Sequence, residues 1–106
     1  MDKGEIVLVP FPFTDLTSTK RRPALVLFSD DNDVTLAFIT TRKHWVKKWD
    51  LNLEPTRQNG LKKSSIVRLA KITTLEKSLV LGRLGKISKA DGKALNRNLR
   101  LLFNLD

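Results

Sequence analysis

The chain has 106 residues, of which 41% are hydrophobic, an ordinary fraction for a globular protein that argues against intrinsic disorder. It carries 20 Lys and Arg against 11 Asp and Glu, and a formal net charge of +9 at this size favours a polyanionic partner, most often nucleic acid. The alternatives are a basic protein kept soluble by its charge, or one neutralised by an acidic protein partner. Because the chain has no cysteine, disulfides and thiolate metal sites are excluded.

Length and hydropathy predict a single domain over residues 1–106 with a modest core, which homodimerisation would help to stabilise. No apolar run approaches the ~20 residues needed to cross a bilayer, and residues 1–3 lead into a predicted strand without a signal-peptide pattern. We therefore expect a cytoplasmic protein that makes no membrane contact.

The first two predicted strands flank an irregular loop. Residues 5–9 (EIVLV) form a largely apolar, β-branched run typical of a buried strand. That strand should end at Pro10 and Pro12, because proline cannot donate a ladder hydrogen bond. Residues 11–21 are rich in Thr, Ser and Asp and predict a loop, after which residues 23–28 (PALVLF) predict a second buried strand.

Turn chemistry organises the middle of the chain. Residues 30–33 (DDND) predict a turn that joins the second strand to a third at about 34–41 (VTLAFITT). Residues 42–48 are polar and basic and predict a loop, and residues 50–54 alternate polar and apolar as a half-exposed strand does. Asn59-Gly60 predicts another turn.

The C-terminal part changes from strand to helix periodicity. Residues 65–69 predict a strand, residues 71–74 continue the sheet after a kink, and residues 79–84 predict a last short strand or turn. Ser88, three residues before Asp91, is a candidate helix N-cap. An apolar helix stripe follows at Leu95, Leu99 and Leu102. Short strands closed by one C-terminal helix predict a mainly β (α+β) fold, a small twisted sheet or partly open barrel. The helix stripe needs cover, which is a second reason to expect a dimer.

Four side chains at or near the ends of predicted strands are candidates for phosphate chemistry. Arg22 enters an apolar strand beside Pro23 and should be held at the rim of the sheet, although most arginines in such places are only surface cations. A guanidinium there can grip a phosphate through two hydrogen bonds. Thr40 and Thr41 offer hydroxyl donors, or reflect only the β-propensity of threonine, and in a regular strand they point to opposite faces. Arg68 is the remaining candidate, or a simple outward-facing strand arginine.

The basic loop mixes aromatic and cationic side chains, a mixture that suits single-stranded RNA because bases stack on aromatic rings. Trp45 is predicted equally to stack or to pack, whereas Trp49 is predicted to pack into the core. His44 is the only histidine; it can carry a proton, but its role is left open. One histidine without clustered acids makes no metal site, so we expect no metal or cofactor.

Three blocks of the sequence resemble the MazF/PemK (Kid-like) endoribonucleases, the toxins of type II toxin–antitoxin systems. They are GEIVLVPFPFTD at 4–15, RRPALVL at 21–27 and SIVRLAKITTLEKSLV at 65–80. The resemblance implies an SH3-like β-barrel with a C-terminal α-helix. It further implies metal-independent, sequence-selective cleavage of single-stranded mRNA through attack of the 2′-hydroxyl, leaving a 2′,3′-cyclic phosphate. A homodimer and a cognate antitoxin are the implied protein partners.

The resemblance also implies roles for individual residues. Arg22, Thr40 and Arg68 match catalytic positions, and residues 17–20 match a flexible segment that overhangs the site. We further assign RNA binding to six residues around the predicted basic rim: Lys20, Arg21, Thr41, Arg42, Lys43 and Trp45.

One position departs from the pattern: Ala70 stands where relatives with the same arginine carry an aspartate. If that acid is what is missing, RNA binding should be strong and cleavage slow, and Ala70→Asp should accelerate cleavage. If Arg22 and Thr40 suffice, the added carboxylate should only repel RNA. Two other functions remain open, a barrel that binds RNA or DNA without cutting it and a CcdB-like toxin directed at gyrase.

Overall fold

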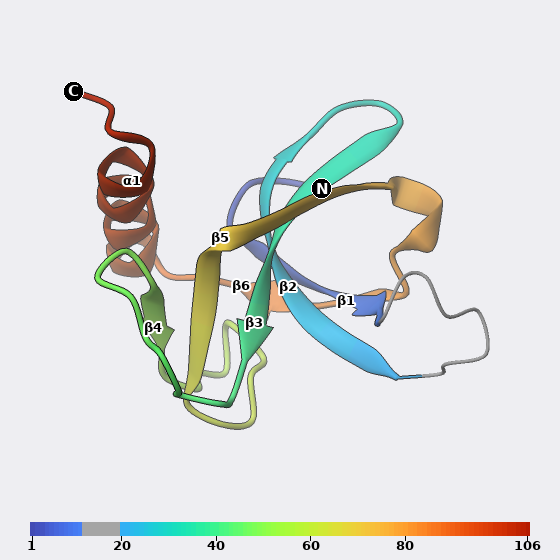
Figure 1. Ribbon diagram of the computed structural model, residues 1–106. Coiled ribbons are helices and arrows are strands. Elements are labelled where there is room, and N and C mark those ends of the chain that lie inside the picture. The colour runs from blue at the N-terminus through green and yellow to red at the C-terminus, as the bar shows by residue number, and fades with distance from the viewer. Residues whose placement is uncertain (12–19) are drawn as a thin grey trace.

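A computed structural model describes residues 1–11 and 20–106. The elements are β1 (Glu5–Pro10), β2 (Arg21–Ser29), β3 (Asp33–Thr40), β4 (Leu51–Leu53), β5 (Ser65–Glu76), a 3₁₀ turn (Lys77–Leu79), β6 (Gly82–Lys86) and α1 (Lys89–Phe103). The strands form one antiparallel sheet of order β4-β5-β3-β2-β1-β6, which curls like a partly open barrel with α1 beside it (Figure 1). The predicted mainly β fold with a C-terminal helix is confirmed.

The strands at 5–9 and 23–28 are confirmed and slightly longer than predicted. β2 begins at Arg21, and Arg22 and Arg21 pair with Val9 and Pro10 of β1. The backbone N–H of Phe11 donates to the carbonyl of Lys20 over 3.0 Å, so these two residues hold the ends of the connection together. The predicted overhanging segment at 17–20 lies, apart from Lys20, outside the described residues.

The β2–β3 hairpin turns where the aspartate cluster predicts it. The Asp30 carboxylate accepts the backbone N–H groups of Asp33 and Asn32 at 2.8 and 3.0 Å. These hydrogen bonds, that from Asp33 foremost, lower the pKa of Asp30. The turn thus depends on the side chain of its first residue.

β5 bends sharply, as the predicted kink requires (Figure 1). Phe38 of β3 pairs with Arg68, but the preceding residue, Ala37, pairs with Ile72, so residues 69–71 form a bulge without partners in that register. Such bulges bend a strand and re-aim its side chains. This bulge separates Arg68 from the second half of the strand and places Ala70 on the surface.

The predicted helix is confirmed with its cap. The Ser88 hydroxyl accepts the N–H of Asp91 over 3.1 Å. Leu95 is buried, and Leu99 and Leu102 pack against the same core, so the chain's own sheet covers this stripe. The stripe therefore gives no reason for a dimer, and the exposed apolar residues of this end are instead Leu101, Phe103 and Leu105.

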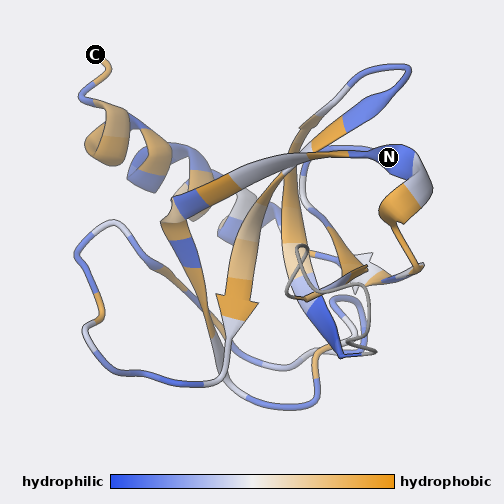
Figure 2. Ribbon diagram, turned by 45° about the vertical axis from the view of Figure 1, so that its right-hand side comes forward, coloured by the Kyte–Doolittle hydropathy of each residue, from blue (hydrophilic) through white to orange (hydrophobic). Residues whose placement is uncertain are grey.

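Apolar residues concentrate on the strands, whereas most loop residues are polar (Figure 2). The buried apolar side chains form two clusters, one on each face of the sheet. The face under α1 carries the larger cluster, which includes the fully buried Ile6, Leu25 and Leu69. The opposite face carries a smaller cluster that includes Val26 and Leu36. This second face is the one on which the candidate site lies.

Candidate active site

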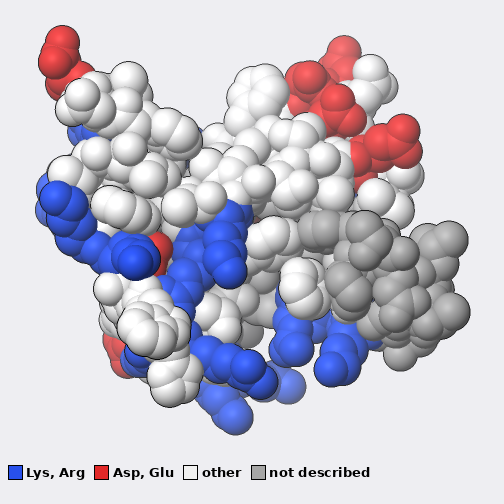
Figure 3. Space-filling model, in the orientation of Figure 1, with Lys and Arg blue, Asp and Glu red and all other residues white. Residues whose placement is uncertain are grey.

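A cavity of about 880 Å³ opens where β2 begins, β3 ends and β5 begins. Its polar wall consists of Arg22, Thr40, Thr41, Arg42, His44, Ser65, Arg68 and Lys71, and its apolar wall of Phe11, Pro23, Phe38, Ile39, Trp45 and Ile72. No Asp or Glu of the described residues lines it. On the face shown in Figure 3, Lys and Arg gather around the lower ends of these strands, whereas Asp and Glu gather mainly at the upper right. The cavity therefore suits an anion.

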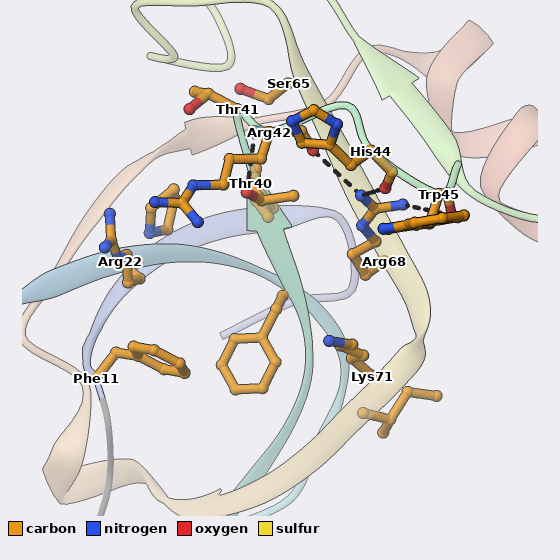
Figure 4. Close-up of a pocket in the computed structure, with 14 residues that line it drawn as sticks. Phe11, Arg22, Thr40, Thr41, Arg42, His44, Trp45, Ser65, Arg68 and Lys71 are labelled. Atoms are coloured by element: carbon orange, nitrogen blue, oxygen red, sulfur yellow. Dashed lines mark hydrogen bonds between the residues drawn. The ribbon is translucent and has the colours of Figure 1, made fainter. Parts of the chain in front are cut away.

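Arg22 and Thr40 reach the cavity from neighbouring strands (Figure 4). Ala24 pairs with Phe38, and the same antiparallel register continued by two residues sets Arg22 opposite Thr40. Side chains directly opposite in an antiparallel pair share one face of the sheet. The strand pairing thus explains why these two predicted residues meet.

Thr40 ends β3, and its hydroxyl shapes the turn that follows. The hydroxyl oxygen accepts the backbone N–H of Arg42 over 3.1 Å, which leaves the hydroxyl hydrogen to donate elsewhere. Thr41 lines the cavity as well, although in a regular strand it would point to the opposite face from Thr40. The reason is that regular strand geometry stops at Thr40, and alternation ends with it.

Arg68 lies at the other side of the cavity, with its guanidinium turned into the loop at 42–45 rather than toward Arg22 (Figure 4). Its two terminal nitrogens donate to the Asp50 carboxylate at 2.9 Å and to three backbone carbonyls, those of Arg42 at 3.1 Å, His44, and Trp45 at 3.3 Å. Its side chain is 15% exposed. Four bonds occupy all four terminal N–H hydrogens.

Asp50 is the partner of Arg68 that the sequence did not reveal. Its side chain is 2% exposed, and besides Arg68 it accepts the backbone N–H of Lys47 over 2.9 Å. Its own carbonyl accepts a hydrogen bond from the Asn98 amide of α1. Arg68 therefore has a carboxylate partner, but one contributed from position 50, 18 residues before it, and not from position 70. The only signal in the sequence is an acid at the end of a basic loop.

The loop between β3 and β4 presents His44 and Trp45 beside the cavity (Figure 4). Trp45 has φ of 58°, one of two non-glycine residues with positive φ in the described chain, and it is 87% exposed. Its ring is therefore not packed, which removes the packing alternative for this residue. Trp49 packs against the main core as predicted.

Three predicted RNA-binding residues, Lys20, Arg21 and Lys43, do not line the cavity that the described residues form. Lys43 instead donates to the Ser64 hydroxyl, which in turn donates to Glu54. The hydrogen bonds from Ser64 and Asn52, helped by the charge of Lys43, lower the pKa of Glu54.

The remaining cavity residues are ones that sequence reasoning did not place there. Phe11 meets the ring of Phe38 edge to face, with 5.7 Å between ring centres. Lys71 and Ile72 line the cavity beside the bulge in β5. The sequence predicts a kink there, but not which side chains the kink turns toward the cavity.

Within residues 1–11 and 20–106, no three His, Cys, Asp or Glu side chains are grouped so that they could hold a metal ion. In the same part of the chain, no helix has the length and apolar character needed to span a membrane.

Comparison with known proteins gives one family and a consistent fold. Residues 2–103 match the model of the PemK-like, MazF-like toxins of type II toxin–antitoxin systems. No curated protein matches the chain in sequence. Among solved structures, a mycobacterial endoribonuclease in complex with its cognate antitoxin is similar, with a TM-score of 0.77, 20% identity, and coverage of 98% of this chain and 95% of that one. The Mycobacterium tuberculosis toxin MazF-mt6 has a TM-score of 0.75 and 22% identity over 96% of this chain and 98% of its own. At such identities the structures establish the fold alone.

Proposed function

Because the chain belongs to the PemK-like, MazF-like toxins of type II toxin–antitoxin systems, we propose that it is an endoribonuclease that cuts single-stranded mRNA in the cavity beside Arg22. The observation that carries this proposal is that Arg22 and Thr40 line the same open cavity. No Asp or Glu of the described residues lines that cavity, and the chain has a net charge of +9. A cytoplasmic location follows from the substrate.

The proposed reaction is attack of a ribose 2′-oxygen on the adjacent phosphorus. The new O2′–P bond forms as the P–O5′ bond breaks, the 2′-hydroxyl proton passes to a base, and the leaving 5′-oxygen takes up a proton. The products are a 2′,3′-cyclic phosphate and a 5′-hydroxyl. The barrier lies mainly in the negative charge that gathers on the phosphorane oxygens, so positioned cations and donors are the most effective catalysts.

Arg22 is suited to stabilise that charge, because it is exposed to the cavity and can offer a planar pair of N–H donors. Thr40 supplies a second donor to a non-bridging oxygen, because its hydroxyl oxygen accepts the Arg42 N–H and its hydrogen is left to donate. Charge stabilisation by arginine needs no metal ion. We therefore expect cutting to persist in EDTA, and a loss that Mg²⁺ restores would contradict this scheme.

Arg68 has a different role in this proposal from the one that the resemblance implies. With its terminal nitrogens bound to Asp50 and the loop carbonyls, it positions the loop and does not hold phosphate. His44, which lines the cavity, is then the best-placed side chain to accept the 2′-hydroxyl proton. This assignment removes the need for an acid at position 70.

A cognate antitoxin and a homodimer are the proposed protein partners. One similar structure is an endoribonuclease bound to its cognate antitoxin, which supports an antitoxin for this chain too. Charge complementarity favours an acidic antitoxin segment lying across the basic cavity. The exposed Phe28, Leu101 and Phe103 offer apolar surface for a second copy.

The test uses end-labelled single-stranded RNA and a matched oligonucleotide that carries a 2′-deoxy sugar at the cleaved nucleotide. We expect the RNA to be cut to a 2′,3′-cyclic phosphate and the matched oligonucleotide to be bound but left intact. Binding of both without cleavage of either would favour the non-catalytic barrel. Inhibition of DNA supercoiling without any RNA cleavage would favour the gyrase-directed toxin.

A further inference from the structure

A second, smaller pocket of about 250 Å³ adjoins the main cavity and shares four residues with it, His44, Trp45, Arg68 and Lys71. Two tryptophans, Trp45 and Trp49, line it, and Ala70 lines it from the bulge of β5. Because the two pockets share a wall, a polymer bound in the first can place a neighbouring group in the second.

Trp45 is held in a conformation that a bulky side chain avoids. Its φ of 58° lies in the left-handed region, which costs free energy for any residue with a Cβ. Nothing in core packing compensates, since the side chain is 87% exposed, but the Arg68 guanidinium bonds to its carbonyl. Backbone strain maintained at an exposed aromatic residue indicates a surface kept for binding.

Trp49 carries a polar group that the described residues do not satisfy. Its ring packs against the main core, while its indole N–H is buried without a partner among the described residues. A buried indole N–H normally has an acceptor, and nucleobases carry acceptors on their edges. Asp50 also lines this pocket, but its carboxylate is paired with Arg68. The exposed Lys47 and Lys71 therefore leave the pocket positively charged for a polyanionic chain.

We propose that this second pocket is a nucleobase subsite, which receives one unpaired base of the RNA next to the phosphate held at Arg22. The base stacks on Trp45, and the small side chain of Ala70 leaves room for it. A longer side chain at position 70, the acid included, would occupy that room. This subsite rests on the proposed function, because it positions the same RNA.

Intrinsic fluorescence can test the subsite directly, because the chain has two tryptophans and no tyrosine, and both tryptophans line this pocket. The probe is a single-stranded oligonucleotide blocked by a 2′-deoxy sugar at the cleaved nucleotide. A series of such probes carries one abasic residue, moved stepwise along the strand. We expect one position next to the cleaved bond at which removing the base weakens binding on the order of ten-fold, as loss of a base–aromatic stack does. Quenching of the tryptophans should disappear at that same position.

Two variants locate this effect in the pocket. Trp45→Gly removes the ring and relieves the positive φ, so the protein should be at least as heat-stable as the wild type yet bind the intact probe on the order of ten-fold more weakly. Ala70→Leu should fill the pocket and abolish the penalty of the abasic residue. Ala90→Leu, the same change at an exposed position of α1, is the matched control and should bind as the wild type does.

The outcomes separate this inference from the proposed function. Wild-type protein that neither binds nor cuts RNA overturns both. Wild-type protein that cuts RNA, but for which no abasic position changes affinity by more than two-fold, overturns the subsite alone. This second result needs no variant, so it holds even if Trp45→Gly or Ala70→Leu fails to fold.

Discussion

The two faces of the sheet differ in what the same strands present: one face is packed under α1, and the other carries the candidate site. On the face under α1, strand residues such as Leu25 and Leu69 are buried in the larger core together with Leu95 of the helix. On the other face, the alternate residues Val26, Ala24 and Arg22 of β2 form one row. Val26 and Ala24 are buried in the smaller apolar cluster, and Arg22, at the start of the strand, is exposed in the cavity. The difference shows that a cavity side chain can extend a packed row of a strand, and the packed part of the strand then fixes its direction.

The helix-covered face should control stability alone. Leu25→Ala removes a side chain with 0% exposure and should lower the free energy of unfolding by about 3 kcal/mol, within the usual 2–5 for such cavities. Cleavage per folded molecule should stay the same, because Leu25 does not line the active-site cavity. Urea unfolding and single-turnover cleavage measure the two effects, and a slower reaction in fully folded protein would break the comparison.

The Asp50–Arg68 pair, on the face of the sheet away from α1, should affect both stability and cleavage. Asp50→Ala leaves a largely buried guanidinium unpaired, and should cost about 2 kcal/mol, less than the ~3–5 of a fully buried pair because Arg68 keeps some exposure. Cleavage should also slow, since the loop carrying His44 and Trp45 loses its anchor. Urea unfolding of Asp50→Ala, Arg68→Met and the double variant tests this: the double should be more stable than the sum of the singles predicts. Strict additivity would mean that the pair does not hold the loop.

Position 70 distinguishes two hypotheses: that the site lacks an acid there, or that it needs none. The structure gives Arg68 a carboxylate from Asp50 and places Ala70 in the second pocket. We therefore expect Ala70→Asp to weaken RNA binding several-fold, through charge and bulk, without accelerating single-turnover cleavage. Faster cleavage at saturating RNA would instead show that an acid is what this site lacks.

The smallest effect concerns Glu5 of β1 and Arg83 of β6, neither of which lines the cavity. The backbone N–H of Asp2 and the Arg83 guanidinium, 2.5 Å from Glu5, lower the pKa of Glu5 below its usual 4.5. A lowered folded pKa contributes stability above the unfolded value, and that contribution is lost as pH falls through the folded value. The stability difference between wild type and Glu5→Gln should thus shrink as pH drops from neutral to about 3. A difference that is the same across this range in urea unfolding would contradict the assignment.

Sequence patterns were sufficient wherever a local cause decides the structure. The β-branched run of β1, the Asp30 turn and the Ser88 cap each depend on side chains within a few residues. Arg22 and Thr40 were recognisable because they stand at the ends of apolar runs, and strand pairing then brings them opposite each other.

The features that the sequence did not predict depend on the path of the chain in space. Asp50 meets Arg68 only because the loop at 41–50 folds back over β5, and hydropathy contains no signal for that path. The left-handed backbone of Trp45 is equally invisible, since tryptophan does not favour it. The hydrogen bonds of Arg68 were equally hidden from the sequence, because its partners lie 18 to 26 residues before it in the chain.

The central claim, that the open face cuts RNA through Arg22, is tested most directly by two neighbouring variants. Arg22 lines the cavity, whereas Arg21 is also exposed but does not line the cavity formed by the described residues. Arg22→Ala should lower the single-turnover cleavage rate by roughly 10²–10³-fold at unchanged unfolding free energy, as loss of a donor to a developing anion does. Arg21→Ala, which removes the same charge one residue away, should change the rate only several-fold. Equal effects of the two variants, or a wild-type rate in folded Arg22→Ala protein, would contradict the account.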